Sequence, residues 1–180
     1  ETEVLRMGYY IYGWRHVPVN VSCLGEKANA TRPEIEQLLV SNSKGVDEET
    51  FERELYVIRR RIEKAAQAAG IHGLYLASLS CRSIIYKGMF LAEDMSEFFP
   101  DLKDERFESA FALYHQRYST NTFPQWWLAQ PFRMLAHNGE INTLKGNTNW
   151  MTSHEIRMSS DAFGDMADDI KPVIPSGSSD

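Results

Sequence analysis

One long amphipathic helix is the feature that most restricts the fold of this chain. Its apolar residues fall on one face because they recur every three or four positions: Phe51, Leu55, Ile58 and Ile62. Asp47 is suited to cap the start of the helix, where Glu48 and Glu49 favour the positive end of its dipole. Gly70 is suited to end it. The sequence therefore predicts a helix over Glu48–Ala69.

Short apolar segments rich in β-forming residues predict strands on both sides of this helix. They are Met7–Tyr12, Ile35–Val40, Leu74–Ser78, Ser83–Lys87, Ala110–Tyr118 and Phe132–His137. The third and fourth would be joined as a hairpin. Two further helices are predicted, Leu91–Phe99, ended by Pro100, and Asn142–Ser159, with Trp150 and Met151 as apolar anchors. Strands and helices do not alternate as in a βαβ array, so the sequence predicts an α+β fold built on antiparallel sheets.

The composition favours one globular domain and argues against several functional classes. The chain has 180 residues, of which 43% are hydrophobic and 24% charged, with a net charge of −6. This acidic balance argues against a nucleic-acid or anionic-membrane binder. No apolar run reaches the roughly 18 residues of a membrane span, and the N-terminus does not resemble a signal peptide. We expect a cytoplasmic protein, and, because the chain has no initiator Met, a fragment of a longer one.

A run of three arginines, Arg59-Arg60-Arg61, is the most basic stretch of the sequence. The helical spacing places these residues among acidic neighbours, Glu52, Glu54 and Glu63. We interpret the run as the solvated, ion-paired face of the long helix rather than as a phosphate site.

Metal and cysteine chemistry have little support in the residue spacing. The five histidines form no HxxxH or HxH pair, and no cysteine lies three residues from another, so no metal site is predicted. Cys23 and Cys81 are too few for a disulfide framework. Arg82 could lower the pKa of Cys81, but neither thiol lies in a Cys–His arrangement. We interpret both as ordinary thiols.

The residues with the strongest chemical potential lie in the segment His115–Asn149 and at the C-terminus. Arg117 follows an apolar strand, where its guanidinium could hold a carboxylate or form a structural ion pair with Glu108 or Glu140. Asn138-Gly139 offers two donors for an oxyanion, although Asn-Gly is also the commonest hairpin turn. Asp180 ends a Ser/Gly loop and, alone, is a typical solvated turn residue.

Taken together, these three groups suit a single ligand. A guanidinium for an α-carboxylate, a carboxylate for an α-ammonium and an oxyanion hole for an attacked carbonyl fit acyl transfer from an amino-acid amide or ester. The residues alone supply neither the nucleophile nor the base of such a reaction.

The same region resembles the glutaminase domain of the large (α) chains of the glutamate synthase family. The resemblance lies in His115–Thr122, Pro131–Met134, Ala136–Thr143 and Gly146–Met151, and extends to Val4–Val19, Phe51–Arg61, Tyr86–Met89 and Pro172–Asp180. Trp127 departs from the family pattern, in which proline is common, but it lies in a loop.

The resemblance implies a class II glutamine amidotransferase domain of the N-terminal-nucleophile hydrolase type. The implied fold is a four-layer αββα sandwich of antiparallel sheets, of which residues 1–180 would form the C-terminal part of a single domain. The implied reaction is hydrolysis of L-glutamine to glutamate and ammonia, which passes to a distant site for addition to 2-oxoglutarate. FMN and an iron–sulfur cluster would belong to the remainder of the glutamate synthase polypeptide, and no cofactor to this chain. An electron-donor subunit or ferredoxin is the implied partner, and the compartment is the cytoplasm or a plastid.

Residue roles follow from matching positions. Arg117 matches the arginine that binds the α-carboxylate of glutamine, and Asp180 matches the aspartate that binds its α-ammonium. Asn138 and Gly139 match the oxyanion pair, and Thr120 is expected to line the same pocket.

The family nucleophile is an N-terminal cysteine whose own α-amine is the base, with a reference pKa near 8. This chain begins at Glu1, and neither Cys23 nor Cys81 lies in the matching context. We therefore expect the chain alone to be inactive as a glutaminase. Two alternatives are another class II glutamine amidotransferase, and a catalytically dead binding or scaffold module of that fold.

Overall fold

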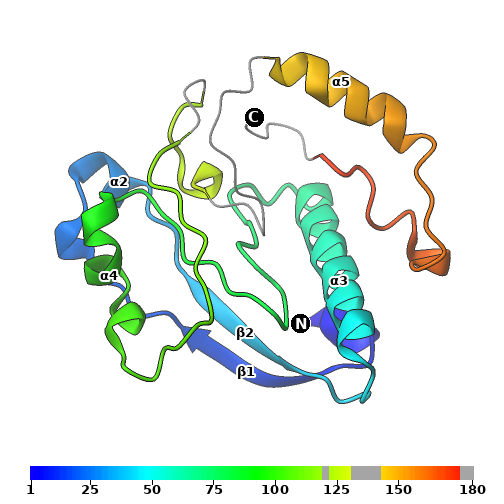
Figure 1. Cartoon of the computed structure of the whole chain (residues 1–180), viewed down its shortest axis with the longest axis horizontal. Coiled ribbons are helices and arrows are strands. Elements are labelled where there is room, and N and C mark those ends of the chain that lie inside the picture. Colours follow the sequence, from blue (N-terminus) through cyan, green and yellow to red (C-terminus); the bar gives the residue numbers. More distant parts are fainter. Residues whose placement is uncertain (119–121, 131–142, 175–180) are drawn as a thin grey trace.

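The fold begins with a two-stranded antiparallel sheet that packs beside one long helix (Figure 1). The structure is a computed structural model, and it describes residues 1–118, 122–130 and 143–174. Its helices and strands are α1 (Thr2–Arg6), β1 (Tyr10–His16), α2 (Glu26–Ala30), β2 (Glu36–Ser41), α3 (Glu48–Ala68), α4 (Met95–Phe98) and α5 (Leu144–Glu155). Short 3₁₀ turns are η1 (Val21–Cys23), η2 (Ala92–Asp94), η3 (Pro100–Lys103), η4 (Trp126–Leu128) and η5 (Gly164–Met166). The α+β class predicted from the sequence is confirmed.

The long helix α3 is bounded as its sequence predicts. The Asp47 carboxylate accepts a hydrogen bond of 2.9 Å from the backbone N–H of Thr50, which satisfies one of the free donors of the first turn. Gly70 follows the C-cap with φ of +69°, a left-handed conformation that glycine adopts without strain. The predicted helix over Glu48–Ala69 is confirmed to within one residue.

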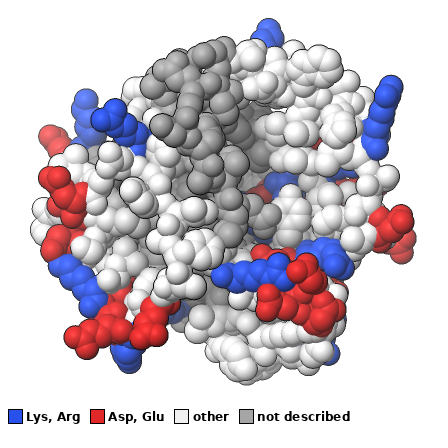
Figure 2. Space-filling model, viewed as in Figure 1, with Lys and Arg blue, Asp and Glu red and all other residues white. Residues whose placement is uncertain are grey.

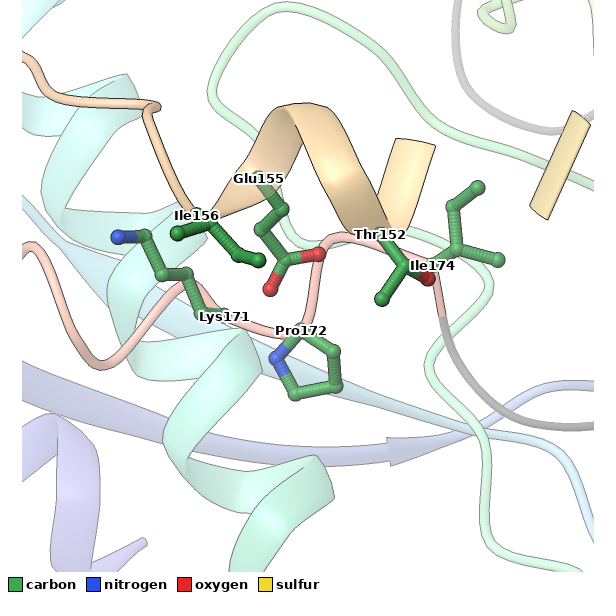
Figure 3. Close-up of a pocket in the computed structure, with 6 residues that line it drawn as sticks. All are labelled: Thr152, Glu155, Ile156, Lys171, Pro172 and Ile174. Carbon is green, nitrogen blue, oxygen red and sulfur yellow. The ribbon is translucent and has the colours of Figure 1, made fainter. Parts of the chain in front are cut away.

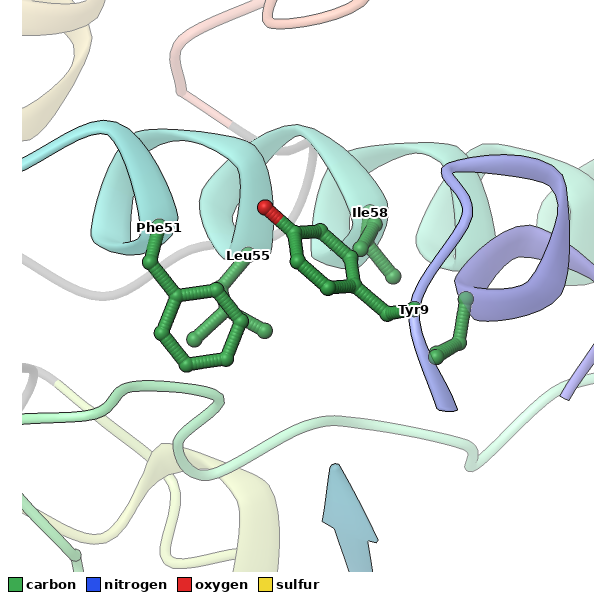
Figure 4. Close-up of a cluster of buried hydrophobic side chains, with 5 residues drawn as sticks. Tyr9, Phe51, Leu55 and Ile58 are labelled. Atoms are coloured by element: carbon green, nitrogen blue, oxygen red, sulfur yellow. The ribbon is translucent and has the colours of Figure 1, made fainter. Parts of the chain in front are cut away.

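Phe51, Leu55 and Ile58 on the apolar face of α3 form the first core cluster together with Val4 of α1 and Tyr9 (Figure 4). The Tyr9 and Phe51 rings lie 5.0 Å apart between centroids. Ile11, Leu38 and Val40 of the sheet pack against this cluster. An isolated two-stranded sheet is marginally stable in water, so this contact with α3 is what holds the strands in place.

The sheet contains one irregularity in its register. Ile11 pairs with Val40 and Gly13 with Leu39, which leaves Tyr12 as an additional residue, a β-bulge. The predicted strand Ile35–Val40 is confirmed as β2, displaced by one residue. The predicted strand Met7–Tyr12 is correct only in its second half, because the turn after α1 delays β1 to Tyr10.

A second core cluster brings together rings from distant parts of the chain. Its buried members are Val17, Phe98, Phe99 and Trp126. Phe98 contacts Phe99 at 4.7 Å and Trp126 at 5.6 Å between ring centroids, and it stacks on Phe90 at 5.0 Å. The predicted helix Leu91–Phe99 takes the form of η2 followed by α4, and Pro100 begins η3. Packing of rings, rather than a regular element, organises this part of the fold.

Three predicted strands do not form, at Leu74–Ser78, Ser83–Lys87 and Ala110–Tyr118. Side chains supply hydrogen bonds there in place of a strand ladder. Ser78 Oγ accepts from the backbone N–H of Ile85 at 3.2 Å, and a Glu52 carboxylate oxygen accepts from that of Cys81 at 2.9 Å. The apolar character of these segments is therefore not sufficient to make strands. The sixth predicted strand, Phe132–His137, lies outside the described residues.

Residues 168–172 pack against α3, and the contacts are made by cationic side chains of the helix. Arg60 Nη2 donates to the backbone carbonyl of Pro172 at 2.5 Å, and Arg61 forms an ion pair with Asp169 at 2.6 Å. Lys64 Nζ donates to the carbonyl of Asp168 at 2.7 Å. The prediction of a solvated arginine face is therefore wrong in part. Arg59 and Arg60 do pair with Glu63, as predicted, but Arg60 is buried.

The helix α5 lies within the predicted range Asn142–Ser159, but its packing differs from the prediction. Trp150 was predicted as an apolar anchor and is instead 79% exposed. None of the helices in the described ranges is long and apolar enough to cross a membrane.

Candidate functional site

Arg117 is the predicted substrate-binding residue that the structure describes. Its side chain is exposed, and its backbone N–H donates to His115 Nδ1 at 3.1 Å. Within residues 1–118, 122–130 and 143–174, no carboxylate forms an ion pair with Arg117, so the alternative of a structural pair with Glu108 is wrong. The other proposed partner, Glu140, lies outside these ranges.

The remaining predicted site residues cannot be placed next to Arg117. Thr120, Asn138, Gly139 and Asp180 lie in residues 119–121, 131–142 and 175–180, outside the described part of the chain. Their roles stay predictions.

The turn η4 follows residues 119–121 in the sequence. Tyr118, the residue after Arg117, contacts the chain immediately before this turn. Tyr118 Oη donates to the backbone carbonyl of Gln125 at 2.9 Å. Trp126 fixes the same turn to the second core cluster, and its indole N–H donates to the carbonyl of Ala28 at 3.0 Å. The turn is thus attached both to the core and to the segment that carries Arg117.

Besides Tyr118 and Ala28, a buried lysine also contacts the η4 region. Lys87 is 8% exposed, and its ammonium donates to the carbonyls of Trp127 at 2.8 Å and Ala129 at 3.0 Å. Its Nζ also lies 5.4 Å from the centroid of the Tyr75 ring. Burial, together with the charge of Arg59, lowers the pKa of Lys87 to about 8.

The residues beside Lys87 explain why these side chains meet. Gly88 allows a close approach, because a Cβ at this position would lie 2.5 Å from the rings of Phe90 and Trp126. The Tyr86 hydroxyl donates to Asp101, which also binds Arg15. The sequence Tyr86-Lys87-Gly88 thus connects the sheet, the second core cluster and η4.

Two phenols near Lys87 are neutral at physiological pH. Burial raises the pKa of Tyr75 to about 12, and burial with the nearby Tyr75 raises that of Tyr118 to about 12. The hydroxyl of Tyr118 is therefore a stable donor to η4.

Neither cysteine has the environment of an activated thiolate. Burial and the Glu52 carboxylate raise the pKa of Cys81, and Arg82 instead pairs with Glu48 and Glu49. Burial raises the pKa of Cys23 as well. Arg82 therefore does not lower the pKa of Cys81, which agrees with the interpretation of Cys81 as an ordinary thiol.

A pocket of about 280 Å³ lies between α5 and the C-terminal segment (Figure 3). It is lined by Thr152, Glu155, Ile156, Lys171, Pro172 and Ile174. The Glu155 carboxylate inside it accepts from the backbone N–H of Val173 at 3.0 Å. This contact ties the chain leading to residues 175–180 to α5.

Charged side chains of opposite sign lie together on the face shown in Figure 2. Ion pairs among the described residues include those of Arg82 with Glu48 and Glu49, and of Arg106 with Asp104. Across the described ranges, no group of three or more His, Cys, Asp or Glu side chains is arranged to hold a metal ion.

The comparisons with known proteins decide the family. The family described as class II glutamine amidotransferases matches residues 1–180. The chain belongs to the class II glutamine amidotransferases. It is 69% identical over its full length to the glutamate synthase [NADPH] large chain of Azospirillum brasilense, of which it covers 12%.

Two further relatives are more distant. Over 96% of this chain, identity is 46% to the glutamate synthase [NADPH] large chain of Bacillus subtilis, with 11% of that protein covered. Over 92% of this chain, identity is 48% to the chloroplastic ferredoxin-dependent glutamate synthase of rice (Oryza sativa subsp. japonica), with 10% covered. The amidotransferase chain thus spans about a tenth of the length of these relatives.

Sequence reasoning missed Lys87 as a residue of interest in this amidotransferase. The segment Tyr86–Met89 contributed to the family resemblance, but a lysine beside a glycine carries no chemical signal by itself. Its importance depends on burial, and on carbonyls some forty residues away in sequence.

Proposed function

We propose that the chain is the glutamine-binding part of a glutamate synthase glutaminase domain, which hydrolyses L-glutamine to glutamate and ammonia. The observation that carries the proposal is the 69% identity that extends over all 180 residues to a glutamate synthase large chain. In the proposed reaction, ammonia passes to a distant site of the same polypeptide and is added to 2-oxoglutarate.

The proposed roles divide the substrate into its charged and reacting groups. Arg117 binds the α-carboxylate, Asp180 binds the α-ammonium, and Thr120 lines the pocket. Asn138 and Gly139 stabilise the oxyanion that forms when the amide carbonyl is attacked. The exposed guanidinium of Arg117, unpaired with any described carboxylate, supports the first of these assignments because it is available to a ligand.

The nucleophile in this proposal is an N-terminal cysteine that is not among the 180 residues of this sequence. Its thiol adds to the amide carbon, its α-amine accepts the thiol proton and then protonates the leaving ammonia, and water later cleaves the thioester. Cys23 and Cys81 do not suit this role, since both have raised pKa values. The 180-residue polypeptide alone is therefore expected to show no glutaminase activity.

We further propose that residues 1–180 form the C-terminal part of one four-layer αββα domain. The exposed residues of the β1–β2 sheet support this arrangement. Tyr10, Tyr12 and Leu39 are 57%, 69% and 48% exposed, and the two tyrosine rings contact each other at 5.3 Å. Such residues suit burial against a second sheet.

The cofactors of the proposed parent enzyme belong outside this chain. An iron–sulfur cluster needs several thiolate ligands, and the two cysteines of this sequence are too few to hold one. We assign FMN, the cluster and the contacts with an electron-donor subunit or ferredoxin to the rest of the polypeptide.

The test is glutaminase activity of the polypeptide that carries this segment, compared with its Arg117→Ala variant. Loss of a charged hydrogen-bonding partner for the α-carboxylate should raise KM for glutamine by about tenfold or more. Arg106→Ala, which removes another exposed arginine, is the control and should leave KM unchanged. An unchanged KM in Arg117→Ala would contradict the assignment.

A further inference from the structure

The Lys87 side chain is an unusual feature of the described fold, because a buried ammonium needs strong compensation. Its position is specified by two carbonyls of one turn, at 2.8 Å and 3.0 Å, and by the Tyr75 ring. The proposed glutaminase chemistry gives Lys87 no role.

The turn that Lys87 holds is connected to Arg117 by one further contact. The Tyr118 hydroxyl donates to the carbonyl of Gln125, the residue that precedes η4. Tyr118 is adjacent to Arg117 in the chain. Displacement of η4 would therefore move the Gln125 carbonyl, which is the acceptor that fixes the orientation of Tyr118. The connection runs from Lys87 through η4 and Tyr118 to the backbone of Arg117.

We propose that Lys87 is a positioning residue for Arg117, acting through the Gln125–Ala129 turn and Tyr118. The inference rests on the proposed function, in which Arg117 binds the α-carboxylate of glutamine. Lys87 does not touch the substrate in this proposal. It determines how well the guanidinium is placed to receive it.

The charge on Lys87 makes this positioning dependent on pH. Its pKa is lowered to about 8, so the ammonium becomes a neutral amine as the pH rises through 8. Among the described residues, the charged and titratable groups that act on it include Arg59 of α3, which pairs with Glu63, and the phenol of Tyr75, which in turn acts on Tyr118. The pKa of each phenol is about 12, so neither phenol changes charge between pH 7 and 9.5. The amine binds the two carbonyls more weakly than the ammonium does.

A double-mutant cycle in the glutamate synthase polypeptide tests the connection. Lys87→Met should raise KM for glutamine about tenfold and change kcat by less than about twofold, because the oxyanion donors are untouched. Added to Arg117→Ala, the same change should raise KM no further. Lys27→Met, the same substitution at an exposed position, is the control and should leave KM unchanged.

The conservative variant Lys87→Arg provides a second readout that a purely structural role would not alter. Arginine keeps its charge at every accessible pH, so KM of this variant should show only the rise that titration of the substrate's own α-ammonium causes. In the unaltered enzyme KM should rise above pH 8. The α-ammonium of glutamine titrates equally in both measurements, so the difference between the two profiles belongs to residue 87.

Each outcome separates this inference from the proposed function. If Arg117→Ala raises KM and Lys87→Met does not, or if the two effects multiply, Lys87 does not act through Arg117. If Arg117→Ala leaves KM unchanged, the substrate role of Arg117 is wrong whatever Lys87 does. Should Lys87→Met fail to fold, identical pH profiles for Lys87→Arg and the unaltered enzyme would overturn the inference.

Discussion

The two core clusters of this chain are built in opposite ways. The first consists of one helix face packed against a sheet, with Phe51, Leu55 and Ile58 at regular spacing. The second consists of rings from short helical turns and loops, with Phe98 of α4 and Trp126 of η4 separated by 28 positions in the sequence. Both clusters contain fully buried side chains, so the difference lies in the backbone that presents them.

This difference determines what each cluster depends on. The helix provides its own backbone hydrogen bonds, and packing of its apolar face supplies most of its stability. The second cluster joins several short segments, and it depends on the rings fitting one another and on the space left at Gly88. Substitutions in the two clusters should therefore have different consequences.

Phe98→Ala should have the largest effect. Phe98 is fully buried and contacts three other rings, so its truncation should cost about 3–5 kcal/mol of unfolding free energy. Near-ultraviolet circular dichroism should lose the signal of Trp126 along with it. Leu55→Ala is the matched change in the first cluster; it should cost about 2–5 kcal/mol and preserve that signal at temperatures where the chain stays folded. Equal loss of the signal in both variants would mean that the clusters are not distinct.

Gly88→Ala should have an intermediate effect, confined to the second cluster. The added methyl group would lie 2.5 Å from the Trp126 ring, and overpacking of this kind typically costs about 1–3 kcal/mol. Gly25→Ala is the control, since its Cβ would meet nothing within 4 Å. Urea denaturation of the two variants measures the difference, and a Gly88→Ala variant as stable as Gly25→Ala would contradict the close packing.

Asp47→Ala should have the smallest effect, on the helix of the first cluster. The bonds from Thr50 hold the pKa of Asp47 below its usual range, so the carboxylate stabilises the folded state at neutral pH. That contribution declines as the pH falls below the unfolded pKa near 3.9, and it is gone once the pH is below the lowered pKa of the folded state. The thermal midpoint of Asp47→Ala should therefore be lower than that of the unaltered chain at pH 7 and converge with it in acid. Asp47→Asn, which keeps a capping oxygen, should retain most of the stability at pH 7.

The same contrast explains how much of the fold could be predicted. The helix α3 was predictable because its apolar spacing, cap and terminal glycine are all local signals. The segments around Leu74–Ser78 and Ser83–Lys87 carry equally apolar residues, but whether they form strands depends on a partner strand that local sequence does not specify. Trp150 was misassigned because an aromatic residue in a helix carries no indication of whether anything covers it.

The candidate site was predictable to a different degree. Arg117 was found from its residue type and from the family resemblance, and its freedom from described carboxylates agrees with a ligand-binding role. Lys87 could not be found in this way. Its pKa shift arises from burial beneath η4, and its acceptors are backbone carbonyls, which every residue possesses.

The contacts of Arg60, Arg61 and Lys64 with residues 168–172 also have a consequence for the order of folding. They join positions more than 100 residues apart in sequence, and contacts of such high sequence separation form late. The backbone hydrogen bonds of α3 join residues close in sequence, so this helix can form before its cationic side chains contact residues 168–172. We therefore expect residues 168–172 to dock on α3 late in folding, after the helix has formed.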